Sequence, residues 1–252
     1  MKTCLATIIA IFLLNIVATE DILNKCISSK NHKLLPGPEG RALSAFHCQA
    51  WNNHSCCTWN TTSSIDKDGT LSLYNMLWDQ CPQKRNMSKK CKRHFEKDTC
   101  FYECSPNLGP WIKVDPISKV TRKERVVNVP ICASDCDQWY HDCMFDYTCN
   151  DNWGLNWNWK KKGTTDMCPK SCKTFREYFS GPKQFCELIF NHSLKYETDE
   201  DKCMNLSPVG SKNVNVARQK AAEMYGKSSS VVVKWDTVAL FVCFYLFSNI
   251  VL

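Results

Sequence analysis

Cysteine is the residue that most constrains how this chain can fold. The sequence of 252 residues holds 18 cysteines; Cys4 and Cys243 lie in the apolar end segments, which leaves 16 between them. An even number is typical of the fully paired disulfide framework of an exported chain. Neighbouring Cys56 and Cys57 cannot bridge to each other without strain, so each is expected to pair elsewhere. The cysteines expected in disulfides are Cys26, Cys48, Cys56, Cys57, Cys81, Cys91, Cys100, Cys104, Cys132, Cys136, Cys143, Cys149, Cys168, Cys172, Cys186 and Cys203.

Three Cys-x3-Cys pairs have a spacing that could also suggest zinc. They begin at Cys100, Cys132 and Cys168. A zinc site or a catalytic thiol needs reduced cysteines, whereas an oxidising compartment favours disulfides. We therefore expect no metal and no cofactor.

The first residues predict a secretory signal peptide. Lys2 gives a basic start, Leu5 to Val17 form a short apolar run, and the small residue Ala18 follows. This run is too short for a stable membrane span but typical of a signal peptide. We expect residues 1–19 to be removed on export.

The last residues predict a glycosylphosphatidylinositol (GPI) anchor. Small residues, a polar spacer and an apolar run from Val238 to Leu252 follow one another, as in GPI-attachment signals. The predicted attachment residue is Gly226 or Ser228. The alternative is a tail-anchored or single-pass helix. Against it, the run is shorter than the ~20 residues that span a bilayer, and no Lys or Arg follows it.

The predicted organisation is one folded domain over residues 20–226, including a short C-terminal stalk, and a propeptide over residues 227–252. We expect this domain on the extracellular face of the plasma membrane, with a shed secreted form as an alternative. The predicted N-glycosylation sites are Asn53, Asn60, Asn86 and Asn191. A fifth sequon, at Asn205, is a poorer acceptor because Pro208 follows it.

The net charge of +7 does not distinguish a soluble surface from a site for anionic ligands. The single basic run, Lys160–Lys162, and the predicted export argue against nucleic acid as a partner.

Apolar periodicity and capping residues predict four helices. They are a short amphipathic helix over Leu73–Cys81, one capped by Ser88 that stops at Ser105-Pro106, one capped by Ser134, and one from Gly181-Pro182 to Phe190. Residues 216–225 fit either a short helix or a stalk. Strand patterns are few, so we expect a mostly helical domain with minor strands.

The sequence contains none of the common catalytic signatures: no Gly-x-Ser-x-Gly, no His-Glu-x-x-His and no phosphate-cradling glycine loop. We therefore expect a binding protein and not an enzyme. Asp98 lies one helical turn before Tyr102, and a carboxylate in an apolar setting needs two donors. A ligand edge with adjacent N–H groups would supply them, and so would an internal ion pair with Arg122 or Arg125.

Three tryptophans, Trp153, Trp157 and Trp159, fall within one predicted loop. Because indole is costly to expose, these side chains either fill the core or line a pocket for a flat ligand. Local sequence leaves both interpretations open.

Several stretches resemble the folate receptor family. They are residues 92–95 and 98–111, the run Arg122-Lys123-Glu124-Arg125 with its continuation to Pro130, and the tryptophan loop. The resemblance runs from about Ile22 to Tyr225 and includes the cysteines. It implies an α+β, mostly helical, disulfide-rich single domain with eight disulfides. It also implies a cell-surface receptor that binds folate and reduced folates and delivers them by endocytosis.

The resemblance also assigns roles by position. Asp98 would accept the paired N–H donors of the pterin ring, Arg122, Arg125 and Ser193 would bond to its acceptors, and aromatic side chains would stack on it. The full set of expected folate contacts is Asp98, Tyr102, Thr121, Arg122, Lys123, Glu124, Arg125, Gly154, Leu155, Asn156, Trp157, Asn158, Trp159, Ser193, Tyr74, Trp78, Thr99 and Trp153.

The departures from the family lie at the glutamate end of the site. Thr121 replaces a Trp, Gly154 and Leu155 replace a His-Lys pair, and Leu194 replaces a Tyr. Losing one partner of a charged hydrogen bond can cost ~1.5–3 kcal/mol. We therefore expect weaker folate binding than in typical members, or a ligand with a different tail. Lys160–Lys162 either replace the lost charge or form a solvated basic face.

Two alternatives stay open. One is a folate-independent cell-adhesion or fertilisation receptor of the Juno type, with a protein partner on another cell. That branch of the family lacks the pterin-binding aspartate, which this chain keeps as Asp98. The other is a riboflavin-binding carrier of a related secreted family, against which the predicted GPI tail argues.

Overall fold

The computed structural model describes residues 22–65, 70–115, 123–155, 157–161, 164 and 167–225. The predicted signal peptide and propeptide, together with Thr121, Arg122 and Asn156, lie outside the described residues. The described part forms one domain that mixes helices and short strands, as the sequence predicts.

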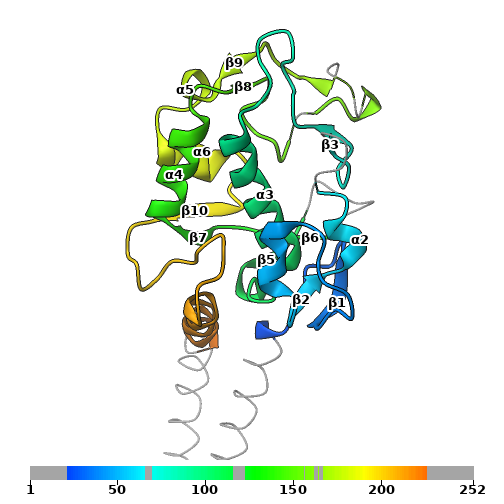
Figure 1. Ribbon diagram of the computed structural model, residues 1–252. Helices are drawn as coiled ribbons and strands as arrows, with labels where there is room; N and C mark the ends of the chain where they lie inside the picture. The colour runs from blue at the N-terminus through cyan, green and yellow to red at the C-terminus, as the bar shows by residue number, and fades with distance from the viewer. Residues whose placement is uncertain are drawn as a thin grey trace, which may run out of the picture.

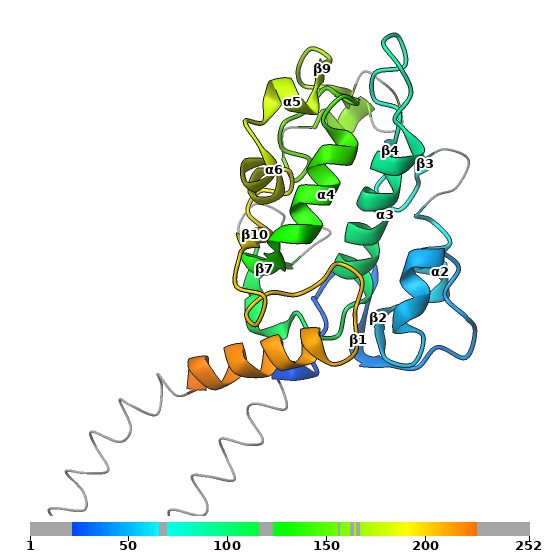
Figure 2. The same ribbon diagram turned by 60° about the vertical axis from the view of Figure 1, so that its left-hand side comes forward.

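Three helices form the centre of the domain. They are α3 (Lys89–Cys104), α4 (Ala133–Cys143) and α6 (Pro182–Leu188), which lie side by side in Figures 1 and 2. The shorter helical segments are η1 (Phe46–Trp51), α2 (Trp59–Thr62), η2 (Gly109–Trp111), η3 (Trp159–Lys161) and α5 (Phe175–Tyr178).

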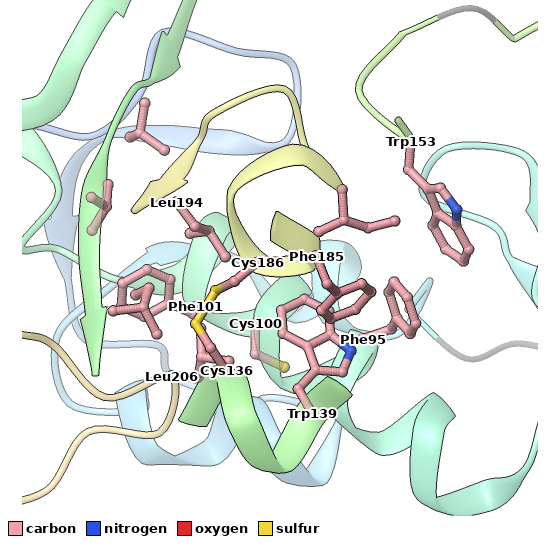
Figure 3. Close-up of a cluster of buried hydrophobic side chains, with 14 of the residues drawn as sticks. Phe95, Cys100, Phe101, Cys136, Trp139, Trp153, Phe185, Cys186, Leu194 and Leu206 are labelled. Atoms are coloured by element: carbon pink, nitrogen blue, oxygen red, sulfur yellow. A yellow bond between two sulfur atoms is a disulfide. The ribbon is translucent and has the colours of Figure 1, made fainter. Parts of the chain in front are cut away.

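Aromatic side chains from the three central helices pack edge to face. The ring centroids of Phe95 and Trp139 are 5.1 Å apart, at 87°, and those of Trp139 and Phe185 are also 5.1 Å apart, at 89°. Figure 3 shows these rings beside the Cys136–Cys186 disulfide that joins α4 to α6. Edge-to-face pairs of this kind contribute ~0.5–1.5 kcal/mol beyond the area that they bury.

The strands form five two-stranded sheets among the described residues. Four pairs are antiparallel and one, β7 with β10, is parallel. The pairs are β1 (His32–Gly37) with β2 (Ser55–Cys57), β3 (Thr70–Leu71) with β4 (Met76–Leu77), β5 (Ile112–Val114) with β6 (Glu124–Val126), β7 (Val129–Cys132) with β10 (Leu194–Glu197), and β8 (Tyr147–Thr148) with β9 (Lys173–Thr174).

The helix predicted over Leu73–Cys81 is wrong. This segment instead completes the β3–β4 hairpin, whose turn ends at Asn75 with a φ of 53°. Asparagine adopts this left-handed conformation more readily than most residues, and a helix cannot pass through it. The apolar spacing of this segment therefore comes from a turn, the short strand β4 and the irregular residues that follow it.

Capping confirms the start of α3 and corrects the start of α4. The Ser88 hydroxyl accepts a hydrogen bond from the Cys91 N–H and donates one to the buried Asp146 carboxylate at 2.6 Å. In α4 the N-cap is Cys132, without a side-chain cap, and the predicted cap Ser134 lies inside the helix. Gly181 and Pro182 begin α6 as predicted.

All 16 cysteines expected to pair do so, in eight disulfides. The neighbours Cys56 and Cys57 bond to different partners, as predicted. The pairs are Cys26–Cys56, Cys48–Cys100, Cys57–Cys104, Cys81–Cys172, Cys91–Cys143, Cys132–Cys203, Cys136–Cys186 and Cys149–Cys168.

Residues 212–225 form a helix, not a stalk, and this helix crosses one end of the domain near β7 and β10 (Figure 2). Its buried face carries Val216, Ala217 and Ala221. Asn213 anchors it through two hydrogen bonds of 2.9 Å with the backbone of Asn205. Among the described residues, no helix is long and apolar enough to cross a membrane.

Replacing the α3 cap should destabilise the domain. Ser88→Ala removes the N-cap and one hydrogen bond to Asp146, so we expect the free energy of unfolding to fall by about 1–2 kcal/mol. Urea unfolding with the disulfides intact measures it. The matched control is Ser134→Ala, which should change the free energy by less than ~0.5 kcal/mol because Ser134 caps nothing. Equal losses in the two variants would contradict the capping assignment.

Candidate ligand-binding site

One face of α3 presents two expected site residues, Asp98 and Tyr102, in line with Phe95. Phe95, Asp98 and Tyr102 follow one another at helical spacing, so their side chains lie along the same face. Asp98 is 5% exposed, and no described residue donates a hydrogen bond to its carboxylate. Burial, and second the nearby charge of Glu103, raise the pKa of Asp98 from 3.8 to about 8. A buried carboxylate in this state is suited to a partner that brings its own donors.

A second buried carboxylate, Glu103, lies at the end of the same helix. The Tyr74 hydroxyl donates a hydrogen bond to Glu103 Oε1, and His32 Nε2 lies 3.3 Å from Glu103 Oε2. Burial, followed by Glu103, raises the pKa of Tyr74 well above its ordinary value. The sequence predicted Tyr74 here but missed His32 and Glu103. Glu103 could have been found from its position on the α3 sequence, whereas His32 gives no local signal.

Arg125 and Ser193, two of the expected folate contacts, lie within hydrogen-bond distance of each other although they are 68 residues apart in sequence. The Arg125 guanidinium donates hydrogen bonds to the carbonyls of Phe190 and Asn191 and, at 3.2 Å, to the Ser193 hydroxyl. Asn191 and His192 form a left-handed turn, with φ of 51° and 58°. Arg125 therefore holds the turn between α6 and β10 from the side of β6.

The Phe190 ring connects this turn to the face of α3. Its centroid is 6.3 Å from those of Phe95 and Trp153, at nearly perpendicular angles. Sequence reasoning did not single out Phe190, although its position three residues before Ser193 could have suggested it. Arg125, which bonds to the Phe190 carbonyl, is thus linked to the aromatic cluster around Phe95.

Trp153 lies in the aromatic core. Its indole stacks on Phe95 with centroids 4.4 Å apart and planes at 13°, and Figure 3 shows it at the edge of the central cluster. The ring nitrogen donates to Thr148 Oγ1 at 3.1 Å, and the side chain is 5% exposed. Phe95 covers one indole face, so a ligand ring could stack only against the other. Of the two interpretations that the sequence left open, core filling and pocket wall, core filling describes Trp153 in this geometry.

Trp157 packs against Trp153, with ring centroids 6.1 Å apart and planes at 72°. Trp157 is 7% exposed and donates its ring N–H to the Trp153 carbonyl at 2.8 Å. Gly154 lies directly against the Phe190–Asn191 turn: a Cβ there would be 3.2 Å from the Asn191 Cβ. The side chain of Asn158 is exposed. The Leu155 carbonyl accepts a hydrogen bond from the side-chain amide of Asn150. The side chain of Trp159 lies outside the described residues.

Two other expected contacts, Glu124 and Thr99, bond to structural partners instead. The Glu124 carboxylate binds Lys25 Nζ at 2.7 Å and the Ser28 N–H at 2.9 Å. Thr99 donates its hydroxyl to the Phe95 carbonyl. Trp78 is 2% exposed, and Lys123 is exposed. Among the described residues, no hydrogen bond joins any of these four side chains to Asp98.

Two of the cavities among the described residues lie away from Asp98. A cavity of about 10 Å³ lies beside Trp157, between Met76 and Met167. A larger one, of about 510 Å³, lies between β10 and the helix over residues 212–225, and no expected folate contact lines it. The closest grouping of metal-ligand types in the described residues is Cys132, Cys203 and Glu200, but those two cysteines are bonded to each other.

Known proteins resemble this chain along most of its length. The family model described as the Folate receptor family matches residues 25–205. The chain is 42% identical to Folate receptor gamma of Homo sapiens over 215 residues, which cover 82% of this chain and 84% of that protein. It is 41% identical to Folate receptor alpha of Homo sapiens, covering 83% and 80%. It is 29% identical to the Riboflavin-binding protein of Gallus gallus, covering 72% and 71%.

The raised pKa of Asp98 should make stability depend on pH. Between about pH 4 and about pH 8 the folded chain keeps a proton on Asp98 that the unfolded chain has lost, so stability falls as pH rises. Asp98→Asn should remove a slope on the order of 1 kcal/mol per pH unit. Urea unfolding across this range compares wild type and variant.

The matched control for this slope is Asp201→Asn, the same change at an exposed aspartate, which should keep the slope. A wild-type slope that survives Asp98→Asn would contradict a protonated Asp98 in the folded chain.

Proposed function

The chain belongs to the folate receptor family, and we propose that it is a cell-surface receptor that binds folate and reduced folates and delivers them by endocytosis. The family match and the identity of about 41–42% to human folate receptors support this proposal. The observation that carries it is the buried carboxylate of Asp98 on the aromatic face of α3. In this proposal the protein is a binding protein and not an enzyme.

Asp98 gives the proposed site its chemical preference. A pterin ring presents adjacent N–H donors along one edge, and a carboxylate can accept both. Burial makes the charged form of the carboxylate unfavourable while no ligand is bound, and the pKa of about 8 reflects the free energy needed to ionise it there. Two donors from the ligand would favour the charged form, so binding at neutral pH would release a proton.

Arg125 and Ser193 supply the opposite polarity. Both carry donor groups and meet at the turn between α6 and β10, where the Phe190 ring packs against Phe95 of α3. A heterocycle with donors on one edge and acceptors on the other would fit between an acceptor, Asp98, and these donors. Arg122, Thr121 and Asn156 belong to the proposed contact set, along with the aromatic residues Tyr74 and Tyr102.

Riboflavin is the second candidate ligand because the chain is also 29% identical to riboflavin-binding proteins. Isoalloxazine is a flat heterocycle with an N–H and carbonyl edge, so it would use the same aromatic face and the same polar side chains. Flavin fluorescence, which is quenched by stacking on aromatic rings, tests this candidate directly.

Calorimetry on the glycosylated ectodomain, residues 20–226, should detect folic acid binding that a free pterin competes. Asp98→Asn should weaken it by ~1.5–3 kcal/mol, the range for a lost charged hydrogen bond. Affinity should fall as pH falls below about 8, by at most ~10-fold per pH unit, because the carboxylate must give up its proton. The control is Asp142→Asn on α4, which should bind normally.

Three outcomes separate the candidates. Binding of riboflavin in place of folic acid would favour the carrier. Binding of neither would contradict the folate proposal and favour a cell-adhesion receptor of the Juno type. Binding of folic acid with equal affinity in Asp98→Asn would contradict the proposed role of Asp98 alone.

Membrane attachment is a separate part of the proposal. We expect the chain to be held by a GPI anchor at Gly226 or Ser228. Phosphatidylinositol-specific phospholipase C should therefore release the full ectodomain from intact expressing cells, as measured by surface staining and by blotting the medium. Retention on the cells after treatment would support a single-pass helix instead. A protein with an appended transmembrane helix serves as the uncleaved control.

A further inference from the structure

We propose that Asn191 carries an N-linked glycan that stands over the entrance of the folate site and disfavours ligands with a long tail. This inference rests on the proposed function. It concerns the sequon Asn191-His192-Ser193, which lies on the turn between α6 and β10.

The geometry of Asn191 suits an attached sugar. The residue is partly exposed and sits in the left-handed turn, with a φ of 51°. Its backbone is fixed, because its N–H donates to the Leu188 carbonyl at 3.0 Å and its carbonyl accepts from Arg125. Among the described residues, none accepts a hydrogen bond from its side-chain amide. The amide nitrogen is therefore left for a glycosidic bond.

Asn205 shows the opposite arrangement. Its side-chain nitrogen donates to the Asp135 carboxylate at 3.2 Å, and its backbone is bonded to Asn213 of the C-terminal helix. A sugar on this nitrogen would have to fit between β7, α4 and that helix. Pro208 also disfavours this sequon. The two partly buried sequons thus differ in whether the fold leaves the amide unengaged.

Gly154 places Asn191 beside the tryptophan loop. A Cβ at position 154 would lie 3.2 Å from the Asn191 Cβ and 3.3 Å from the Phe190 carbonyl carbon, tighter than most real contacts. The loop can approach the turn this closely because residue 154 has no side chain. In the family, the position of Gly154 holds a residue expected at the glutamate end of the ligand. Asn191 therefore occupies space next to the place where a ligand tail would leave the site.

Arg125 and Ser193 connect the same turn to the ring end of the site. Arg125 bonds to the Asn191 carbonyl, and Ser193 lies two residues further along the chain. A glycan on Asn191 thus begins next to both proposed pterin contacts. Because the asparagine backbone is fixed, the first sugar should stay near the entrance. A small flat ring could pass it, whereas a ring with a charged tail would meet it.

The test uses the ectodomain, residues 20–226, secreted from mammalian cells. Glycopeptide mass spectrometry first measures occupancy at Asn191, which should be high. Stopped-flow tryptophan fluorescence then gives association rates for folic acid and for pterin-6-carboxylic acid, which lacks the tail. Asn191→Gln should raise the rate for folic acid several-fold and leave the pterin rate unchanged. Asn86→Gln, the same change at an exposed sequon, should leave both rates unchanged.

A second measurement guards against a folding defect in Asn191→Gln. Wild-type ectodomain made with high-mannose glycans folds with its sugars attached and can then be trimmed by endoglycosidase H to a single residue. Trimming should shift the folic acid rate towards that of Asn191→Gln. An unoccupied Asn191, or equal folic acid rates in all forms, would overturn the inference alone. No binding of either ligand in any form would overturn both this inference and the proposed function.

Discussion

Helix α3 is held covalently from three directions, and the rest of the domain is arranged around that constraint. Cys91 joins it to α4, Cys100 to η1 and Cys104 to β2. Each bond closes a loop of about 50 residues, for which chain-entropy estimates give ~4 kcal/mol of stabilisation. A helix fixed in this way can carry buried carboxyl groups such as those of Asp98 and Glu103, because stabilisation from the disulfides offsets the cost of burying them.

Cysteine count and capping residues predicted much of this fold, and local periodicity failed where turns intervene. The pairing of all mature cysteines followed from an even number in an exported chain, and Ser88 marked the start of α3. The β3–β4 hairpin was missed because its apolar spacing also fits a helix. The left-handed turn at Asn75, which a helix cannot pass through, leaves no signal in that spacing. Strands of two or three residues give too few alternations to be recognised, and each depends on a partner distant in sequence.

The candidate site shows a similar division. Resemblance to the family assigned Arg125 and Ser193 to the acceptors of one ligand ring, and the structure brings the two side chains within 3.2 Å of each other. Position alone could not tell which way a side chain points, because neighbouring strand residues face opposite sides. Glu124 therefore binds the N-terminal segment while Arg125 turns to the site. The presence of three tryptophans in one loop also does not show which of them fills the core. For Trp153, stacking on Phe95 shows that it does.

The parallel pairing of β7 with β10 has a consequence for how this family can vary. Val129 pairs with Leu194, directly after Ser193, while Arg125 precedes β7 on the adjoining strand β6. A deletion between Arg125 and Val129 would pull the guanidinium away from its turn. Changes of length between β5 and β6 lie upstream of this register and leave it intact. Insertions between β5 and β6 should therefore leave this register unchanged, whereas the spacing from Arg125 to Val129 is fixed by it.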